Sequence, residues 1–144
     1  MKRIFLASWL LLILLVSGCG VKTSLPSLTI TNYDTAEDGS LILDTEGIIP
    51  DYQCNSRGLK DKILFLESSY CSACQLALPK INEAAKDTGV NITDLDLSKQ
   101  TDAAEMSKLK VLPYYTPTLV IGCKVYIGGK SKSDYTSILS SFKK

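Results

Sequence analysis

Hydrophobic positions change their spacing along the chain, and these changes predict a succession of strands and helices. Residues 63–66 form an uninterrupted apolar run, as expected for a strand buried on both faces. Small and apolar residues then recur at helical spacing over residues 74–87, and Gly89 is a suitable end for that helix. Residues 90–97 predict a second strand, whose change of apolar phase suits a strand buried on both sides or one that carries a bulge.

The last third of the chain predicts a helix, a hairpin and a final helix. Residues 101–110 place acids early and lysines late, which suits the dipole of a short helix. Two β-rich runs at 118–121 and 124–127 are separated by only two residues, which predicts a hairpin. Ser131 and Asp134 form a capping-box-like start to a helix with an apolar stripe. The order β-α-β-α-β-β-α predicts an α/β fold with a mixed central sheet flanked by helices.

The amino-terminal residues have the pattern of a targeting segment. Lys2 and Arg3 precede a mostly apolar run at residues 4–16, which is too short for a comfortable membrane span and suits the core of a signal peptide. Residues 16–19 (Val-Ser-Gly-Cys) resemble the lipobox of prokaryotic lipoproteins, in which cleavage leaves a lipid-modified Cys19 at the new amino terminus. The alternative is a plain signal peptide or an uncleaved anchor. Either way, we expect an extracytoplasmic domain, held at the cell membrane if Cys19 carries lipid.

Composition divides the chain into four predicted parts. We expect a signal peptide at residues 1–18, a lipidated tether at 19–32, an extension of undecided structure at 33–59 and a compact domain at 60–144. The signal segment holds two of the 16 basic residues and none of the 15 acidic ones, so the mature chain is close to neutral. Its charge gives no indication of nucleic-acid binding.

Two cysteines at the head of the first predicted helix carry the candidate chemistry. Cys71 and Cys74 are separated by the small residues Ser72 and Ala73, and positions three apart in a helical turn lie within reach of a disulfide. The pair can therefore open and close with little movement of the backbone. A strand, a turn and a helix that together present a dithiol indicate redox chemistry.

Several landmarks around this dithiol resemble the thioredoxin superfamily. Pro79 lies where the family carries its helix-kinking proline, and Thr116-Pro117 looks like the family's cis-proline segment. The resemblance spans about residues 60–143 and implies a thioredoxin-like fold that performs thiol–disulfide exchange. A cis bond before Pro117 would hold the backbone next to Cys71 and leave Thr116 free to pair with a substrate strand. Tyr70 stands where thioredoxins usually carry a tryptophan, and it can still shield one side of the sulfur.

The roles of the two sulfurs follow from their places in the helix. Amides at a helix amino terminus stabilise negative charge, so we expect Cys71 to be the nucleophilic thiolate and Cys74 the thiol that resolves the mixed disulfide. The chain contains no histidine, so no imidazolium can stabilise the Cys71 thiolate. This absence favours a reductase or an isomerase over a strong oxidase.

The chain departs from the family at the acid that often lies near the second cysteine. The family often has a buried acid six positions before the first cysteine, where this chain has Phe65. Glu67 is two residues closer on the same strand face, which makes it a candidate proton acceptor for Cys74. The alternative is a solvated or salt-bridged acid at the end of the strand.

The remaining cysteines predict a second disulfide. If Cys19 carries lipid, an even number of cysteines remains for sulfur chemistry. In the expected topology the strand after Pro117 runs antiparallel to the first strand, which brings Cys123 near Cys54. We expect a structural disulfide between them; the alternative is two unpaired thiols. A four-cysteine zinc site is disfavoured because only one close cysteine pair exists, and we expect no metal or other cofactor.

These patterns predict a membrane-tethered thiol–disulfide oxidoreductase. Its expected partners are thiols and disulfides of exported proteins, with a membrane electron carrier or a small thiol to recycle it. Tyr114 and Tyr115, just before the proline, either line the substrate groove or are ordinary packing residues. The competing hypothesis is a non-enzymatic thioredoxin-fold module that binds a partner and keeps the 71–74 disulfide for structure.

Overall fold

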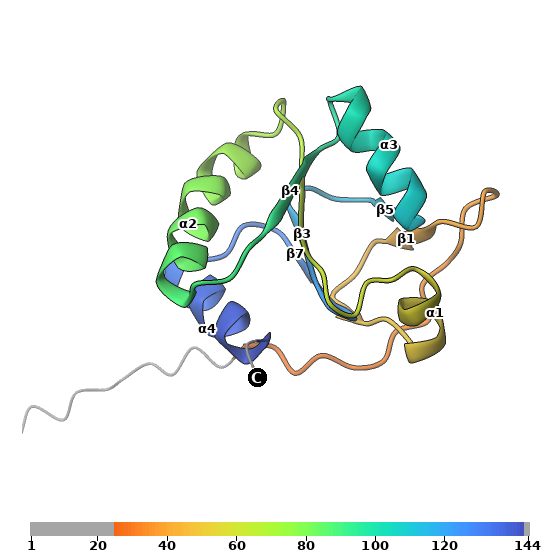
Figure 1. Ribbon diagram of the computed structural model, residues 1–144, viewed down its shortest axis with the longest axis horizontal. Coiled ribbons are helices and arrows are strands. Elements are labelled where there is room, and N and C mark those ends of the chain that lie inside the picture. The colour runs from red at the N-terminus through yellow and green to blue at the C-terminus, as the bar shows by residue number, and fades with distance from the viewer. Residues whose placement is uncertain (1–24, 143–144) are drawn as a thin grey trace, which may run out of the picture.

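The computed structural model describes residues 25–142, which form a five-stranded sheet, a separate two-stranded sheet and four helices (Figure 1). The predicted signal peptide and Cys19 lie outside the described residues. Within residues 25–142, every helix is too short or too polar to cross a membrane. The elements are β1 (Leu41–Leu43), β2 (Gly47–Ile48), α1 (Asp51–Ser56), β3 (Ile63–Glu67), α2 (Ser72–Thr88), β4 (Thr93–Asp96), α3 (Gln100–Leu109), β5 (Val111–Pro113), β6 (Thr118–Ile121), β7 (Lys124–Ile127) and α4 (Lys132–Phe142).

The larger sheet has the strand order β2-β7-β6-β3-β4, with β3 near its centre. Strand β3 runs parallel to β4 and antiparallel to β6, and β6 and β7 form the expected hairpin. The parallel pair is connected through α2, as a βαβ unit requires. The predicted α/β class with a mixed sheet is therefore confirmed.

Two apolar clusters lie on opposite sides of this sheet, which explains the uninterrupted apolar run of β3. Because side chains alternate along a strand, Ile63 and Phe65 join the cluster under α2 and α4. Leu64 and Leu66 join the other cluster, which contains residues of α1, α3 and the two-stranded sheet. Burying apolar side chains on both faces provides most of the driving force for this architecture.

The extension that the sequence left undecided is part of the folded domain. Strand β2 pairs antiparallel with β7 at one edge of the sheet, and β1 pairs in parallel with β5. The sequence pattern does not predict β1, β2, α1 or β5, because each is too short for a hydrophobic period to develop. Tertiary pairing of β1 with β5 and of β2 with β7, rather than local propensity, makes these strands regular.

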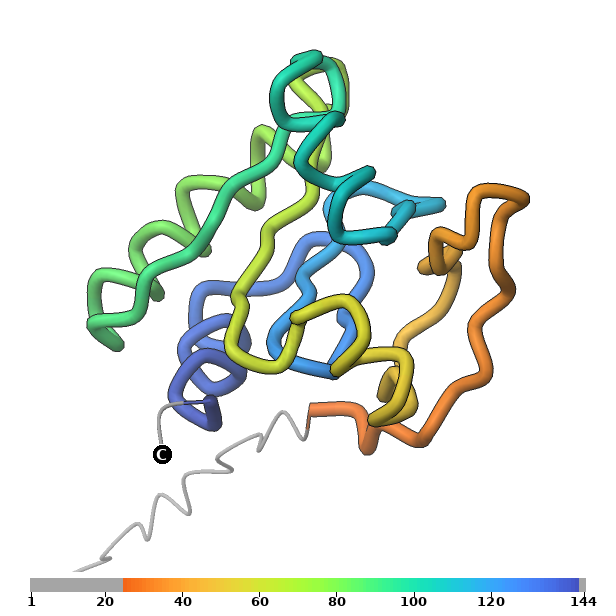
Figure 2. Tube along the Cα trace, turned by 45° about the vertical axis from the view of Figure 1, so that its right-hand side comes forward, coloured from red at the N-terminus to blue at the C-terminus, as the bar shows by residue number. Residues whose placement is uncertain are grey.

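The described part of the expected tether also lies against the sheet. Ile30 forms a bridge with Ile48, and the Thr31 N–H donates a 2.9 Å hydrogen bond to the Ile48 carbonyl oxygen. Figures 1 and 2 show the chain from residue 25 running along the bottom of the domain, beneath α1, before it rises to β1. The short edge strand β2 leaves backbone groups that this segment can satisfy, so the chain is held to the domain before residue 33.

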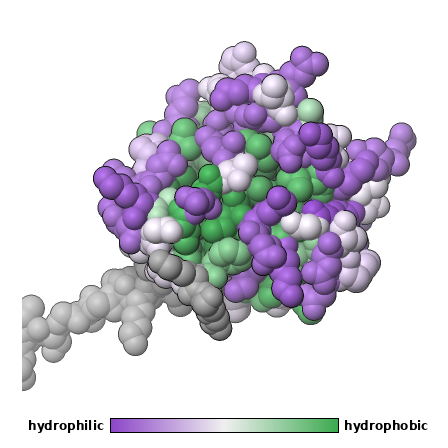
Figure 3. All heavy atoms as spheres, in the orientation of Figure 1, coloured by the Kyte–Doolittle hydropathy of each residue, from purple (hydrophilic) through white to green (hydrophobic). Residues whose placement is uncertain are grey.

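Strand β4 is an edge strand, and it is shorter than the predicted strand at 90–97. Its first two residues, Thr93 and Asp94, are exposed, and a charge is a common protection for a free edge. Figure 3 shows apolar side chains gathered near the middle of the face drawn there, in the region of β3 and β4, with hydrophilic side chains around them. The two residues that close β4, Leu95 and Asp96, are buried.

Candidate functional site

The cysteine pair lies where β3 ends and α2 begins. Cys71 is the N-cap residue of α2, in an extended conformation, and its Sγ accepts a 3.1 Å hydrogen bond from the Cys74 N–H. The Cα atoms of the two cysteines are 5.2 Å apart, and their sulfurs are joined as a disulfide. Cys74 is fully buried whereas Cys71 is half-buried, so the outer sulfur is the one that a substrate can reach.

A cis peptide bond between Thr116 and Pro117 lies directly opposite the outer sulfur. The Thr116 carbonyl oxygen is 3.5 Å from Cys71 Sγ, although the two residues are 45 positions apart in the chain. The Thr118 hydroxyl donates a 2.7 Å hydrogen bond to the Tyr115 carbonyl oxygen, which supports this turn. The structure therefore brings together the two landmarks that the sequence suggested, one after β3 and one before β6. The chain has a thioredoxin-like fold.

Comparisons with known proteins return thioredoxins among solved structures. Thioredoxin O2 from Arabidopsis thaliana, in its oxidized state, is 17% identical, with 77% of this chain and 100% of that chain covered and a TM-score of 0.44. The oxidised thioredoxin from Plasmodium falciparum is 13% identical, with 72% and 97% covered and a TM-score of 0.43. Thioredoxin Mala s 13 from Malassezia sympodialis is 12% identical, with 83% and 100% covered and a TM-score of 0.44. No protein-family model and no curated protein matches the sequence.

Exposed tyrosines precede both segments of the site, the cysteine pair and the cis-proline. Tyr70, immediately before Cys71, has 91% of its surface exposed. Tyr114 and Tyr115, immediately before Thr116, are also exposed and contact each other edge to face, with ring centroids 4.8 Å apart. The two tyrosines before the proline therefore lie on the surface and not in the core. Such rings offer apolar area and a hydroxyl to a partner chain.

Glu67, the candidate proton acceptor, is the last residue of β3 and is buried. It stands in register with Asp96 on the neighbouring strand and takes part in none of the ion pairs among residues 25–142. Burial raises the pKa of the Glu67 carboxyl, and the nearby carboxylates of Asp94 and Asp96 raise it further. A carboxyl whose pKa is raised by burial is better suited than an ordinary one to exchanging protons with a thiol.

We expect a Glu67→Gln variant to be more stable than the parent at neutral pH. The pKa of Glu67 is higher in the folded chain than in the unfolded chain, so protonation of this carboxyl stabilises the folded state. This contribution to the free energy of unfolding is complete below the pKa of the unfolded chain, and it is lost as pH rises through the pKa of the folded chain. The difference in unfolding free energy should therefore grow from acid to neutral pH. Urea titrations across that range would measure it, with Glu37→Gln, at an exposed position, as the control for losing a carboxylate. A difference independent of pH would contradict the assignment.

The second cysteine pair lies at the other end of the sheet. Cys54 in α1 is disulfide-bonded to Cys123 in the turn between β6 and β7, with Cα atoms 5.5 Å apart. The Ile49 N–H donates a 2.7 Å hydrogen bond to the Cys123 carbonyl oxygen, so backbone and side chain both attach the extension to the hairpin. Among residues 25–142, no group of three or more His, Cys, Asp or Glu side chains is arranged so that it could hold a metal ion. The two cysteine pairs form separate disulfides at opposite ends of the sheet.

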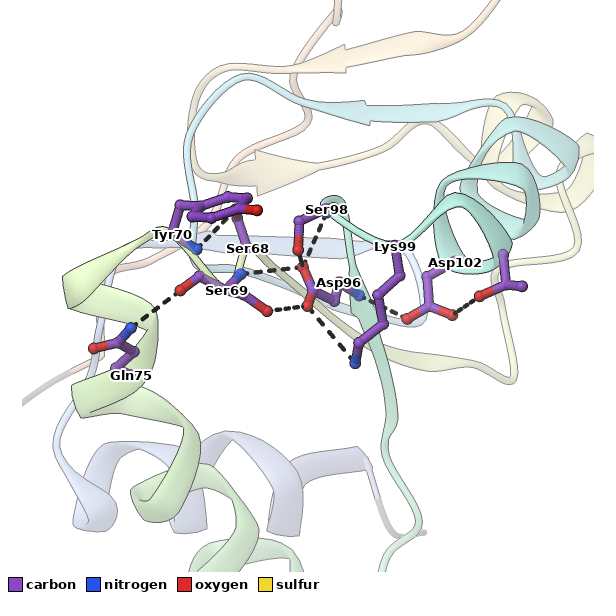
Figure 4. A network of polar contacts seen from close by, with 9 residues as sticks. Ser68, Ser69, Tyr70, Gln75, Asp96, Ser98, Lys99 and Asp102 are labelled. Atoms are coloured by element: carbon purple, nitrogen blue, oxygen red, sulfur yellow. Dashed lines mark hydrogen bonds and ion pairs between the residues drawn. The ribbon is translucent and has the colours of Figure 1, made fainter.

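The sequence did not predict a network of polar contacts that includes Ser68, Ser69 and Tyr70, the residues just before Cys71 (Figure 4). It is centred on Asp96, whose carboxylate accepts hydrogen bonds from Ser69 and Ser98. These hydrogen bonds hold the pKa of the Asp96 carboxyl well below its usual range. The available signal was weak: serines just before the dithiol, and an acid and a serine at the end of a predicted strand. Nothing in the sequence alone relates these two segments.

Proposed function

We propose that this protein is an extracytoplasmic, membrane-tethered thiol–disulfide oxidoreductase. The observation that carries the proposal is the placement of the Cys71 sulfur. It is partly accessible at the amino terminus of α2, between the Cys74 N–H at 3.1 Å and the Thr116 carbonyl oxygen at 3.5 Å. A sulfur that receives an amide hydrogen bond at a helix start is stabilised as a thiolate, the form that attacks disulfides. The tether and the compartment follow from the lipobox resemblance around Cys19.

The reaction transfers two electrons from the reduced pair to a substrate disulfide. The Cys71 thiolate attacks one substrate sulfur, forms a mixed disulfide and expels the other substrate sulfur as a thiolate. Cys74 then gives up its proton, for which Glu67 is the candidate acceptor, and attacks Cys71 Sγ. This second step releases the first substrate sulfur and leaves the 71–74 disulfide. A membrane electron carrier or a small thiol must then reduce the pair again.

The surroundings of the sulfur suit an extended polypeptide substrate from an exported protein. Among the described residues, no backbone group pairs with the Thr116 N–H, which leaves it available to a substrate strand. The exposed rings of Tyr70, Tyr114 and Tyr115 add apolar contact area for side chains of that strand. Backbone pairing supplies affinity without requiring a fixed substrate sequence.

Equilibration of the 71–74 pair with glutathione or dithiothreitol buffers would test the proposal. We expect reversible exchange, with a reduction potential closer to about −270 mV than to about −120 mV, because the chain has no histidine to stabilise the thiolate strongly. Alkylation and peptide mass measurement would report the redox state of each pair, with the peptides of Cys54 and Cys123 as the internal control. A pair that fails to exchange would contradict the proposal; a potential near −120 mV would contradict only the direction.

A further inference from the structure

The loop that leads into Cys71 is held through Ser69. The Ser69 N–H donates a 3.1 Å hydrogen bond to Asp96 Oδ1, and its hydroxyl donates to Asp96 Oδ2. On the other side, the side-chain amide of Gln75 in α2 donates a 3.0 Å hydrogen bond to the Ser69 carbonyl oxygen. Figure 4 shows these contacts converging on Ser69 from β4 and from the first turns of α2. Every polar group of Ser69 therefore has a partner, two residues before the outer cysteine.

The neighbouring residue Ser68 makes further hydrogen bonds within the same loop, one of them with Cys71. The Ser68 hydroxyl accepts a 3.3 Å hydrogen bond from the Tyr70 N–H, and the Ser68 carbonyl oxygen accepts one of 2.9 Å from the Cys71 N–H. The loop from 68 to 71 thus forms a tight turn fixed at its middle by Asp96. Its geometry decides where the Cys71 sulfur lies relative to the Cys74 N–H and Thr116.

Asp96 is itself firmly held by groups of the turn that follows β4. Only 1% of its surface is exposed, at the end of β4 beside the end of β3. Ser98 donates to Asp96 Oδ1 from its N–H at 2.9 Å and from its hydroxyl at 2.5 Å. Lys99 Nζ is 3.6 Å from Asp96 Oδ2, and the Asp96 N–H donates to Asp102 at 3.1 Å. A buried carboxylate with this many donors is a rigid anchor, because leaving any of its partners unsatisfied is unfavourable.

We propose that Asp96 is a positioning residue of the redox centre, acting through Ser69 to hold Cys71 where the Cys74 N–H can stabilise its thiolate. This inference rests on the proposed function and extends it to a residue that touches neither cysteine. Loosening Ser69 would let the turn at 68–71 relax, and the amide hydrogen bond to the Cys71 sulfur would weaken. The reduced protein should then carry less thiolate on Cys71 at a given pH.

A matched pair of variants tests the role of Ser69. Ser69→Ala and Ser98→Ala each remove one hydroxyl that donates to Asp96, but only Ser69 belongs to the redox loop. We expect the rate of Cys71 alkylation in the reduced protein, measured below the pKa of the thiol, to fall about threefold to tenfold in Ser69→Ala. Ser98→Ala should leave the rate within about twofold of the parent. Asp96→Asn also weakens the hold on Ser69, but it removes a negative charge, which by itself favours the thiolate, so the serine pair is the decisive comparison.

The possible outcomes distinguish a role in positioning Cys71 from a role in protein stability alone. They also distinguish failure of this inference from failure of the proposed oxidoreductase function. A purely structural role predicts lower thermal stability in both serine variants and an unchanged profile of Cys71 alkylation against pH, which would overturn the inference. An equal fall in both variants would also overturn it, because the effect would then come from the Asp96 charge and not from the loop. The serine pair remains informative if Asp96→Asn does not fold. Alkylation of the reduced thiol needs no substrate, so it is independent of whether the 71–74 pair exchanges with protein disulfides.

Discussion

Replacement of Cys74 by serine should convert a transient exchange into a stable covalent complex between Cys71 and its protein substrates. In the parent, the inner sulfur is buried one helical turn beyond Cys71. In the proposed mechanism it attacks the mixed disulfide from within the protein. A serine hydroxyl is too weak a nucleophile at neutral pH to perform that step. Non-reducing electrophoresis of the Cys74→Ser variant, isolated from its own compartment, should show species of higher mass that disappear on reduction.

The complementary variant is the control for this experiment. Cys71→Ser removes the accessible nucleophile, so it should form no such complexes, and its exchange with a model protein disulfide should be slower by on the order of 10³-fold. Cooperative urea unfolding with a slope like that of the parent would show that both variants remain folded. If Cys74→Ser traps no partner in this folded state, the 71–74 disulfide is structural and the protein is better described as a thioredoxin-fold binding module.

Removal of the Cys54–Cys123 disulfide should lower the free energy of unfolding by about 4 kcal/mol. The bond joins residues that are 69 positions apart, and a crosslink that closes a loop of this length restricts the unfolded chain strongly. It also fastens α1 to the hairpin of β6 and β7, so the extension loses its covalent attachment to the sheet. Urea unfolding of a Cys54→Ala/Cys123→Ala variant against the parent, both oxidised, would measure the difference.

The second cysteine pair provides the matched control for this stability experiment. The Cys71–Cys74 bond spans only three positions, so a Cys71→Ala/Cys74→Ala variant should lose about half as much stability. Cys71 exchange with glutathione should persist in the variant that lacks the 54–123 bond, because that bond lies at the opposite end of the sheet. Equal losses in the two double variants, or a loss below about 1 kcal/mol for the long loop, would contradict the assignment.

The sequence by itself determined the features that depend on near neighbours in the chain. The apolar run of β3, the helical spacing of α2 and the dithiol between them follow from local periodicity, and the structure places Cys71 at the helix start as that pattern indicates. The cap of α4 is local as well: the Asp134 N–H donates a 3.1 Å hydrogen bond to the Ser131 hydroxyl, as the capping-box pattern predicts. These features need no knowledge of which distant segments meet.

Tertiary structure alone decided which distant segments meet at the site and at the sheet edges. Ser69 and Asp96 are 27 positions apart, and in the sequence each is an ordinary residue for a turn or a strand end. Only the parallel pairing of β3 and β4 places them together. The pairing of β1 with β5 likewise gives regular structure to segments too short to show a period. A hydrogen bond between remote residues forms only after the core has fixed their backbones. Its energy therefore depends on packing that no local pattern records.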